Sequence, residues 1–149
     1  MIVEFLIMTT ETTVNIIFGS DYYNHNFKKQ LISYLHNNRI IGSSYDVCIN
    51  FDKVNSSDKY TAYIDEVCCK TLSSSYPRTY GVLISSDGID TKYLAGNYRA
   101  INCGLIVNNE YMQPIGKNPV NCFSIDSRFS TIENCANTIK DIVSNDNFI

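Results

Sequence analysis

Short apolar runs alternate with segments of helical periodicity along most of the chain, and this alternation constrains the fold more than any other feature. Runs typical of buried strands lie at 14–19, 47–51, 80–84, 99–107 and 120–125. Amphipathic helices are expected between them, at about 25–38, at about 60–72 after a possible cap at 56–58, and briefly at about 89–95. The pattern Ser130-x-x-Glu133 predicts a capping box that opens a last helix, with Ile132, Cys135, Ile139 and Val143 facing inward.

Strand–helix alternation of this kind predicts an α/β fold with a mostly parallel sheet. Right-handed crossovers place helices on both faces, which gives a three-layer αβα Rossmann-like sandwich with five parallel strands. We expect the flavodoxin-like order 2-1-3-4-5, because it is the most common arrangement for a small sheet of this kind. The 149 residues suit one domain, expected at 14–149 behind an N-terminal extension at 1–13.

Charge and hydropathy exclude two classes of partner. The formal net charge is −3, and no basic surface of the kind that binds nucleic acid is visible. No apolar run reaches the roughly 18–20 residues that span a bilayer. The apolar segment 1–8 lacks a basic start and a small-residue cleavage site, so we do not interpret it as a signal peptide. We therefore expect a cytoplasmic protein.

The six cysteines are expected to be reduced thiols. Cys48, Cys103 and Cys122 lie in apolar, strand-like runs, and adjacent Cys68 and Cys69 would point to different sides of a helix. A zinc site is not expected, because the chain has no C-x-x-C pair and only two histidines.

Two small polar loops follow the first and third predicted strands. They are Gly19-Ser20-Asp21 and Ser85-Ser86-Asp87-Gly88, and each leads into a helix N-terminus. In the predicted order these strands flank the switch point of the sheet, where ligands bind beyond the carboxyl ends. Free backbone N–H groups and the helix dipole favour an anion there. The alternative is that both loops are only turns with helix caps.

The motifs, taken together, resemble those of the family of ribose-5-phosphate isomerase type B and galactose-6-phosphate isomerase. Gly19-Ser20-Asp21 with the following helix resembles the family's G-[CS]-D-H-A-G-x-x-L-K, and the segment 81–88 resembles G-I-L-I-C-G-T-G. Weaker matches are Tyr60-Thr61-Ala62-Tyr63 to a Y-P segment and Arg99-Ala100 to G-I-R-A. Asn118-x-x-Asn121 with Asp126-Ser127-Arg128 resembles H-N-x-x-N-x-L-x-x-G-x-R.

This resemblance implies aldose–ketose isomerisation of a phosphorylated sugar through a cis-enediol, as in the pentose phosphate pathway. It implies no metal and no organic cofactor. It also implies a homodimer or a larger assembly of dimers, with active sites between subunits. The chemistry needs a base next to the carbonyl, N–H groups for the oxyanion, groups that open the sugar ring and an arginine for the phosphate.

Carried onto this chain, the resemblance assigns candidate catalytic residues Asp21, Ser85, Asp87 and Asp90 and candidate substrate-binding residues Tyr22, Gly88, Lys117, Asn118 and Arg128. Several of them differ from the family. Ser85 stands at the position of the basic cysteine, and Thr91 at the position of a glutamate that other members carry. Tyr22 and Lys117 stand at histidine positions, and Asp87 and Asp90 replace neutral residues of the anion-binding loop.

Three functions remain open from the sequence. The first is an isomerase with altered chemistry that uses Asp21 together with Asp87 or Asp90, one of the latter two being the base. The second is a catalytically inactive homologue that binds a sugar phosphate or partners an active paralogue. The third is an unrelated flavodoxin-like binding protein.

Overall fold

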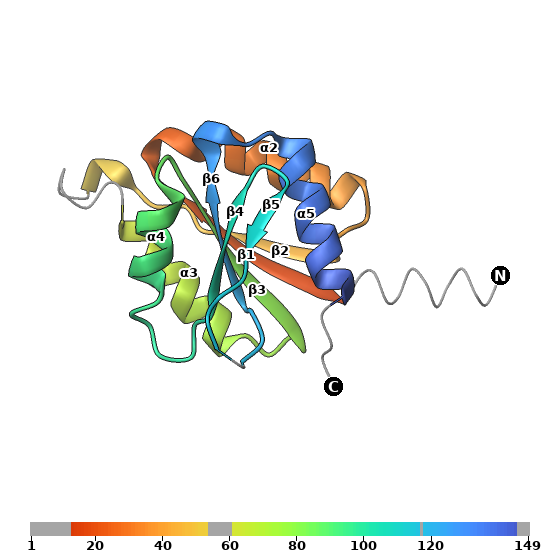
Figure 1. Cartoon of the computed structure of the whole chain (residues 1–149). Coiled ribbons are helices and arrows are strands. Elements are labelled where there is room, and N and C mark those ends of the chain that lie inside the picture. Colours follow the sequence, from red (N-terminus) through yellow and green to blue (C-terminus); the bar gives the residue numbers. More distant parts are fainter. Residues whose placement is uncertain (1–12, 54–60, 117, 146–149) are drawn as a thin grey trace.

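A six-stranded sheet in the order β2-β1-β3-β6-β4-β5 forms the middle layer of the computed structural model (Figure 1). The structure describes residues 13–53, 61–116 and 118–145. The strands are β1 (Val14–Ser20), β2 (Ser43–Asp46), β3 (Arg78–Ser85), β4 (Cys103–Val107), β5 (Glu110–Met112) and β6 (Cys122–Asp126). All neighbours pair in parallel except β4 and β5, which are antiparallel.

Two helices cover each face of the sheet. The helices are α2 (His25–Asn37), α3 (Ala62–Ser73), α4 (Gly88–Ala95) and α5 (Ile132–Asn145). Buried side chains of α2 and α5 share one core cluster with alternate residues of β1, β3 and β6, and α3 and α4 share a second cluster on the opposite face. The central strands are buried on both sides, as strands of parallel sheets are. The predicted three-layer αβα class is confirmed.

The predicted strand order is wrong in its second half. The first half of the order is as expected, because β1 lies between β2 and β3. The last parallel strand, β6, lies between β3 and β4, whereas the predicted order places it at the edge of the sheet. The strand count is six, because β5 forms a short antiparallel edge beside β4 that sequence reasoning missed. The consequence for the site is direct, since the end of β6 lies beside the end of β3.

Local predictions differ from the structure at two further places. The strand expected at 47–51 is found directly before that segment, as β2. Val47 is buried but belongs to the loop that follows β2. Phe51 begins a short 3₁₀ helix, η2 (Phe51–Lys53). The capping box is also wrong, because the Ser130 hydroxyl accepts from the N–H of Asn108 while Thr131 Oγ1 accepts from the N–H of Asn134. The possible cap at 56–58 lies outside the described residues.

All six cysteines are free thiols, and Cys68 is buried while Cys69 is exposed, as predicted. Cys103 and Cys122 are buried as expected, but Cys48 is exposed. In the part of the chain that the structure describes, no helix is both long and apolar enough to cross a membrane.

A buried lysine joins α2 to the end of β2. Lys28 is only 2% exposed, and its Nζ lies 2.6 Å from Asp46 Oδ1 and 3.1 Å from the carbonyl oxygen of Val47. A lysine in such a place needs both partners, because an unpaired buried ammonium is strongly unfavourable. This contact fixes the start of α2 against the edge of the sheet.

Candidate functional site

Three adjacent strands, β1, β3 and β6, end at the same edge of the sheet. Ser20 pairs with Ile84, and Ser85 pairs with Asp126, so the residues that follow these strands lie side by side. The predicted switch point between β1 and β3 is therefore present. The end of β6 contributes Asp126 and Arg128 to the same edge, which the predicted strand order would have placed one strand farther away.

Asp21 follows β1 and caps the short 3₁₀ helix η1 (Tyr22–Asn24). Its Oδ1 accepts hydrogen bonds from the N–H groups of Tyr23 (3.1 Å) and Asn24 (3.0 Å) and from Nδ2 of Asn24 (2.6 Å). Burial raises the pKa of the Asp21 carboxyl above its usual value, and the hydrogen bonds lower that pKa by a smaller amount. Asp21 is only 2% exposed, and its side chain stabilises the turn that follows β1.

Asn24 and Ser127 join the three strand ends, and sequence reasoning missed both. Asn24 Nδ2 also donates to Ser86 Oγ (3.1 Å), after β3. Ser127, after β6, donates from its hydroxyl to Asn24 Oδ1 and lies 3.0 Å from the carbonyl oxygen of Ser85. Asn24, three residues after Asp21 of the Gly-Ser-Asp motif, gives no signal in the sequence, because its partners come from strands far apart in the chain.

Ser85 and Thr91 form a buried pair of hydroxyls. Their oxygens lie 2.8 Å apart, and the two residues are 4% and 5% exposed. The Tyr63 side chain, also buried, lies close to both; burial raises its pKa, and the two hydroxyls lower it by less. His25 is exposed at the start of α2, directly after η1, and His36 lies near the end of α2, where it bonds Ser44 at 2.8 Å.

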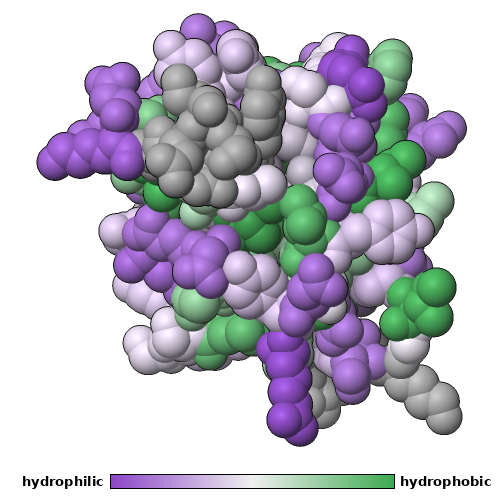
Figure 2. All heavy atoms as spheres, turned by 90° about the vertical axis from the view of Figure 1, so that its left-hand side faces the viewer, coloured by the Kyte–Doolittle hydropathy of each residue, from purple (hydrophilic) through white to green (hydrophobic). Residues whose placement is uncertain are grey.

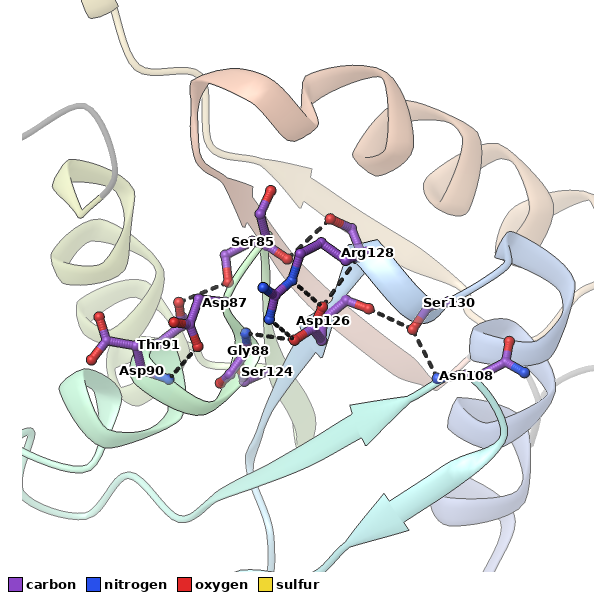
Figure 3. Close-up of polar contacts among 12 residues, drawn as sticks. Ser85, Asp87, Gly88, Asp90, Thr91, Asn108, Ser124, Asp126, Arg128 and Ser130 are labelled. Carbon is purple, nitrogen blue, oxygen red and sulfur yellow. Dashed lines mark hydrogen bonds and ion pairs between the residues drawn. The ribbon is translucent and has the colours of Figure 1, made fainter.

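Asp87 and Asp90 are exposed at the start of α4. Asp87 is the N-cap, and its Oδ1 accepts from the N–H of Asp90 at 3.1 Å. Figure 3 shows both carboxylates on the α4 side of the site, and the charge of Asp87 is close enough to Arg128 to contribute to its raised pKa. Their geometry is that of a helix cap and a first-turn acid, which the helix dipole stabilises.

Gly88 is glycine because α4 begins in close contact with β6. A Cβ atom at this position would lie 2.9 Å from the Cβ of Asp126 and 2.9 Å from Leu105 Cδ1. The carbonyl oxygen of Gly88 accepts from the Ser124 hydroxyl at 2.7 Å, and its N–H donates to Asp126 Oδ2 at 3.3 Å. The backbone at Gly88 makes the close approach expected of this glycine, and the group that it approaches is the Asp126 carboxylate of the same chain.

Arg128, the predicted phosphate ligand, is paired with Asp126. Its Nη2 lies 3.0 Å from Asp126 Oδ2, and its Nε lies 3.3 Å from Asp126 Oδ1 (Figure 3). The hydrogen bond to Asp126 raises the pKa of Arg128. Asp126 stands where the motif G-x-R has glycine, so sequence reasoning could have found it by asking what that replacement adds.

The remaining substrate-binding candidates do not share one place. Tyr22 is 51% exposed next to the site, and its ring makes edge contacts with Tyr23 and Phe51. Asn118 precedes β6, so it lies near the amino ends of the parallel strands, whereas Asp21 follows β1 and lies at their carboxyl ends. Lys117 lies outside the described residues.

Among the described residues, no group of three or more His, Cys, Asp or Glu side chains could hold a metal ion. The edge is thus built from hydroxyls, a bonded amide, two buried carboxylates and one paired guanidinium. Such groups can orient a polar ligand.

Searches with the sequence gave no matching family model and no matching curated protein. Comparison of the structure with solved structures gave several matches, all similar in fold. A crystal structure of ribose-5-phosphate isomerase B from Mycoplasma genitalium with bound ribulose-5-phosphate is 20% identical, with a TM-score of 0.65 over 92% of this chain and 87% of that one.

Two further solved structures agree with it. A ribose 5-phosphate isomerase from Thermotoga maritima is 19% identical, with a TM-score of 0.66 over 88% of this chain and 86% of the other. The type B ribose 5-phosphate isomerase of Leishmania infantum is 15% identical, with a TM-score of 0.67 over 89% and 84%. The resemblance noted in the sequence is confirmed at the level of the fold: this chain has the fold of the type B ribose-5-phosphate isomerases.

Proposed function

We propose that this chain is a catalytically inactive homologue of the aldose–ketose sugar-phosphate isomerases. The observation that carries the proposal is the hydrogen bond between Ser85 and Thr91. These are the two positions at which the resemblance places a catalytic base, cysteine at one and glutamate at the other. In this chain each carries a hydroxyl, and each hydroxyl is bonded to the other.

A hydroxyl pair of this kind does not remove a proton from carbon. Aliphatic hydroxyls have a far higher pKa than a thiol and need an adjacent base to become reactive. The buried Tyr63 side chain, which lies close to both hydroxyls, has its pKa raised by burial, so it stays protonated. Isomerisation through an enediol requires a base in contact with the substrate.

The four carboxylates at this edge do not supply the missing base. Asp21 and Asp126 are buried, and each accepts hydrogen bonds from neighbouring backbone or side chains. Asp87 and Asp90 are exposed to water on α4. Burial raises the pKa of the Asp21 carboxyl, but its Oδ1 is occupied by hydrogen bonds from the N–H groups of Tyr23 and Asn24 and from the Asn24 amide.

The same edge supports assembly into a homodimer, the state that the resemblance implies. Four large apolar side chains around it are more than half exposed: Tyr22, Tyr23, Ile89 and Phe129. Figure 2, which faces the left-hand side of Figure 1, shows hydrophobic side chains near the centre of that face among hydrophilic ones. Clustered exposed apolar surface favours association with another protein surface. A second copy is the partner proposed here, and an active paralogue is the alternative.

A coupled assay of ketose formation tests the inactive state. Purified protein is incubated with ribose 5-phosphate, allose 6-phosphate or galactose 6-phosphate, and each variant is checked for folding by circular dichroism. We expect wild type, Ser85→Ala and Asp87→Asn to give the rate of buffer alone. Turnover by wild type that is lost in either folded variant would show that the chain is an isomerase with relocated chemistry.

Sedimentation velocity tests the assembly. A homodimer sediments with twice the 16.9 kDa mass of the chain, and Phe129→Ser at the exposed edge weakens it. A protein that stays monomeric at every concentration contradicts this part of the proposal.

A further inference from the structure

The candidate site already contains an anion, the carboxylate of Asp126. Asp126 is the last residue of β6, and it is only 4% exposed. Its Oδ2 accepts from the Gly88 N–H at 3.3 Å and from Arg128 Nη2 at 3.0 Å, and its Oδ1 accepts from the N–H and Nε of Arg128. Figure 3 shows the guanidinium folded over the carboxylate, between β6 and the start of α4.

The groups that hold Asp126 are the groups that would hold a ligand anion. Gly88 is the first residue of α4, where free N–H groups and the helix dipole favour negative charge. Arg128 offers a planar pair of donors that matches a carboxylate or a phosphate. Among the described residues whose side chains or backbone groups bond one another at the ends of β1, β3 and β6, Arg128 carries the cation, and it is paired with Asp126.

We propose that Asp126 determines the specificity of this site: it acts as a built-in anion that excludes phosphate and phosphorylated ligands and leaves the site to uncharged ones. The inference rests on the proposed function because it takes this edge as the ligand site. It concerns binding, so it does not depend on whether the chain catalyses isomerisation.

Competition favours the internal carboxylate for two reasons. A group attached to the same backbone has an effective concentration in the millimolar range or above, which a weakly bound free anion does not reach. An incoming phosphate that takes the half-exposed guanidinium of Arg128 would also leave the buried Asp126 carboxylate without its charged partner, which is unfavourable. The exposed carboxylates of Asp87 and Asp90 add repulsion at the rim.

The carboxylate has little freedom to move aside. The backbone beside it is fixed, because the Asp126 carbonyl oxygen accepts from the Ser130 hydroxyl at 2.6 Å. On the other side, α4 is held to β6 by the bond from Ser124 to the Gly88 carbonyl. Release of Arg128 by rotation of Asp126 would therefore leave Gly88 unbonded inside a packed contact.

The test is isothermal titration of wild type and Asp126→Asn with inorganic phosphate, ribose 5-phosphate and unphosphorylated ribose. Asparagine keeps the shape and one acceptor for Gly88, and it removes the charge. The matched control is Asp141→Asn, which removes an equal charge from an exposed position of α5 outside the candidate site. We expect Asp126→Asn to bind both phosphates at least about tenfold more tightly than wild type, because a charge-assisted hydrogen bond is worth about that factor.

Two further variants keep the outcome decisive. The gain is expected to disappear in Asp126→Asn/Arg128→Ala, and Asp141→Asn is expected to behave as wild type. A folded Asp126→Asn protein that gains no phosphate affinity would overturn the proposal. If Asp126→Asn does not fold, wild type decides alone: phosphate binding that Arg128→Ala abolishes would show that Arg128 is already available. Isomerase turnover is measured separately, so either proposal can fail without the other.

Discussion

Replacing Asn24 with alanine is expected to destabilise the protein more than its place in a short surface turn suggests. The side chain makes three hydrogen bonds, to Asp21, to Ser86 and from Ser127. The bond to a buried carboxylate is worth about 1.5–3 kcal/mol, and each bond to a hydroxyl about 0.5–1.5 kcal/mol. Ser86 is exposed, and water can replace its bond.

The expected loss for Asn24→Ala is therefore about 3 kcal/mol in the free energy of unfolding. For a chain of this length that corresponds to a fall of roughly 6–12 °C in Tm. Ser127→Ala is expected to cost about 1–2 kcal/mol, because it removes two hydroxyl bonds. The coupling energy between the two changes is expected to be about 1 kcal/mol, because they share one hydrogen bond.

Urea unfolding followed by circular dichroism and by fluorescence of the eleven tyrosines measures these values; the chain has no tryptophan. The matched control is Asn26→Ala, at an exposed position of α2, which is expected to change stability by less than about 0.5 kcal/mol. An Asn24→Ala protein within about 1 kcal/mol of wild type, or additive effects of the two changes, would refute the conclusion that Asn24 joins the three strand ends.

Three further predictions concern single contacts. Gly88→Ala is expected to cost about 1–3 kcal/mol in urea unfolding, because the added Cβ would overlap Leu105 and the last residue of β6; an unchanged midpoint would contradict it. The pKa of Asp21, measured by NMR titration, is expected to lie above 3.8 and to rise further in Asn24→Ala, because burial raises it and the Asn24 hydrogen bond lowers it. The folded state then binds this proton more tightly than the unfolded state, so the contribution of Asp21 to stability falls as the pH rises from 3.8 through the folded-state pKa; a pKa below 3.8 would reverse that sign. Lys28→Ala is expected to cost about 1.5–3 kcal/mol, because it removes a buried ammonium from a partly exposed carboxylate at the end of β2 and from the Val47 carbonyl; a loss below about 1 kcal/mol, as for a surface pair, would contradict it.

The layers of the fold could be predicted from sequence, and the lateral order of the strands could not. Periodicity identifies a strand or a helix by the burial of its own residues, as Leu31 and Leu35 in α2 show. It contains no information on whether the next strand in the chain is also the next strand in the sheet. Here β4 leaves a gap beside β3, and β6 fills that gap. The edge strand β5 was missed because three residues are too few to show alternation.

The candidate site was predicted in its parts and not in its connections. The motifs brought Asp21, Ser85, Gly88 and Arg128 to one edge, and the structure places them there. The partners that decide what these residues do come from other segments: Thr91 for Ser85, and Asp126 for both Gly88 and Arg128. Hydrogen bonds between strand ends depend on the lateral order of the sheet, which is the part that the sequence pattern leaves open.

Exchange of the C2 proton of ribose 5-phosphate in D₂O tests the central claim most directly. An enzyme that forms an enediol removes this proton, and the base can exchange it for a deuteron from solvent before a hydrogen is returned to carbon, even when little ketose accumulates. Proton NMR of ribose 5-phosphate with the folded wild-type protein is expected to show the exchange rate of buffer alone. Faster exchange that disappears in Ser85→Ala, Asp87→Asn or Asp90→Asn would contradict the account and identify the base.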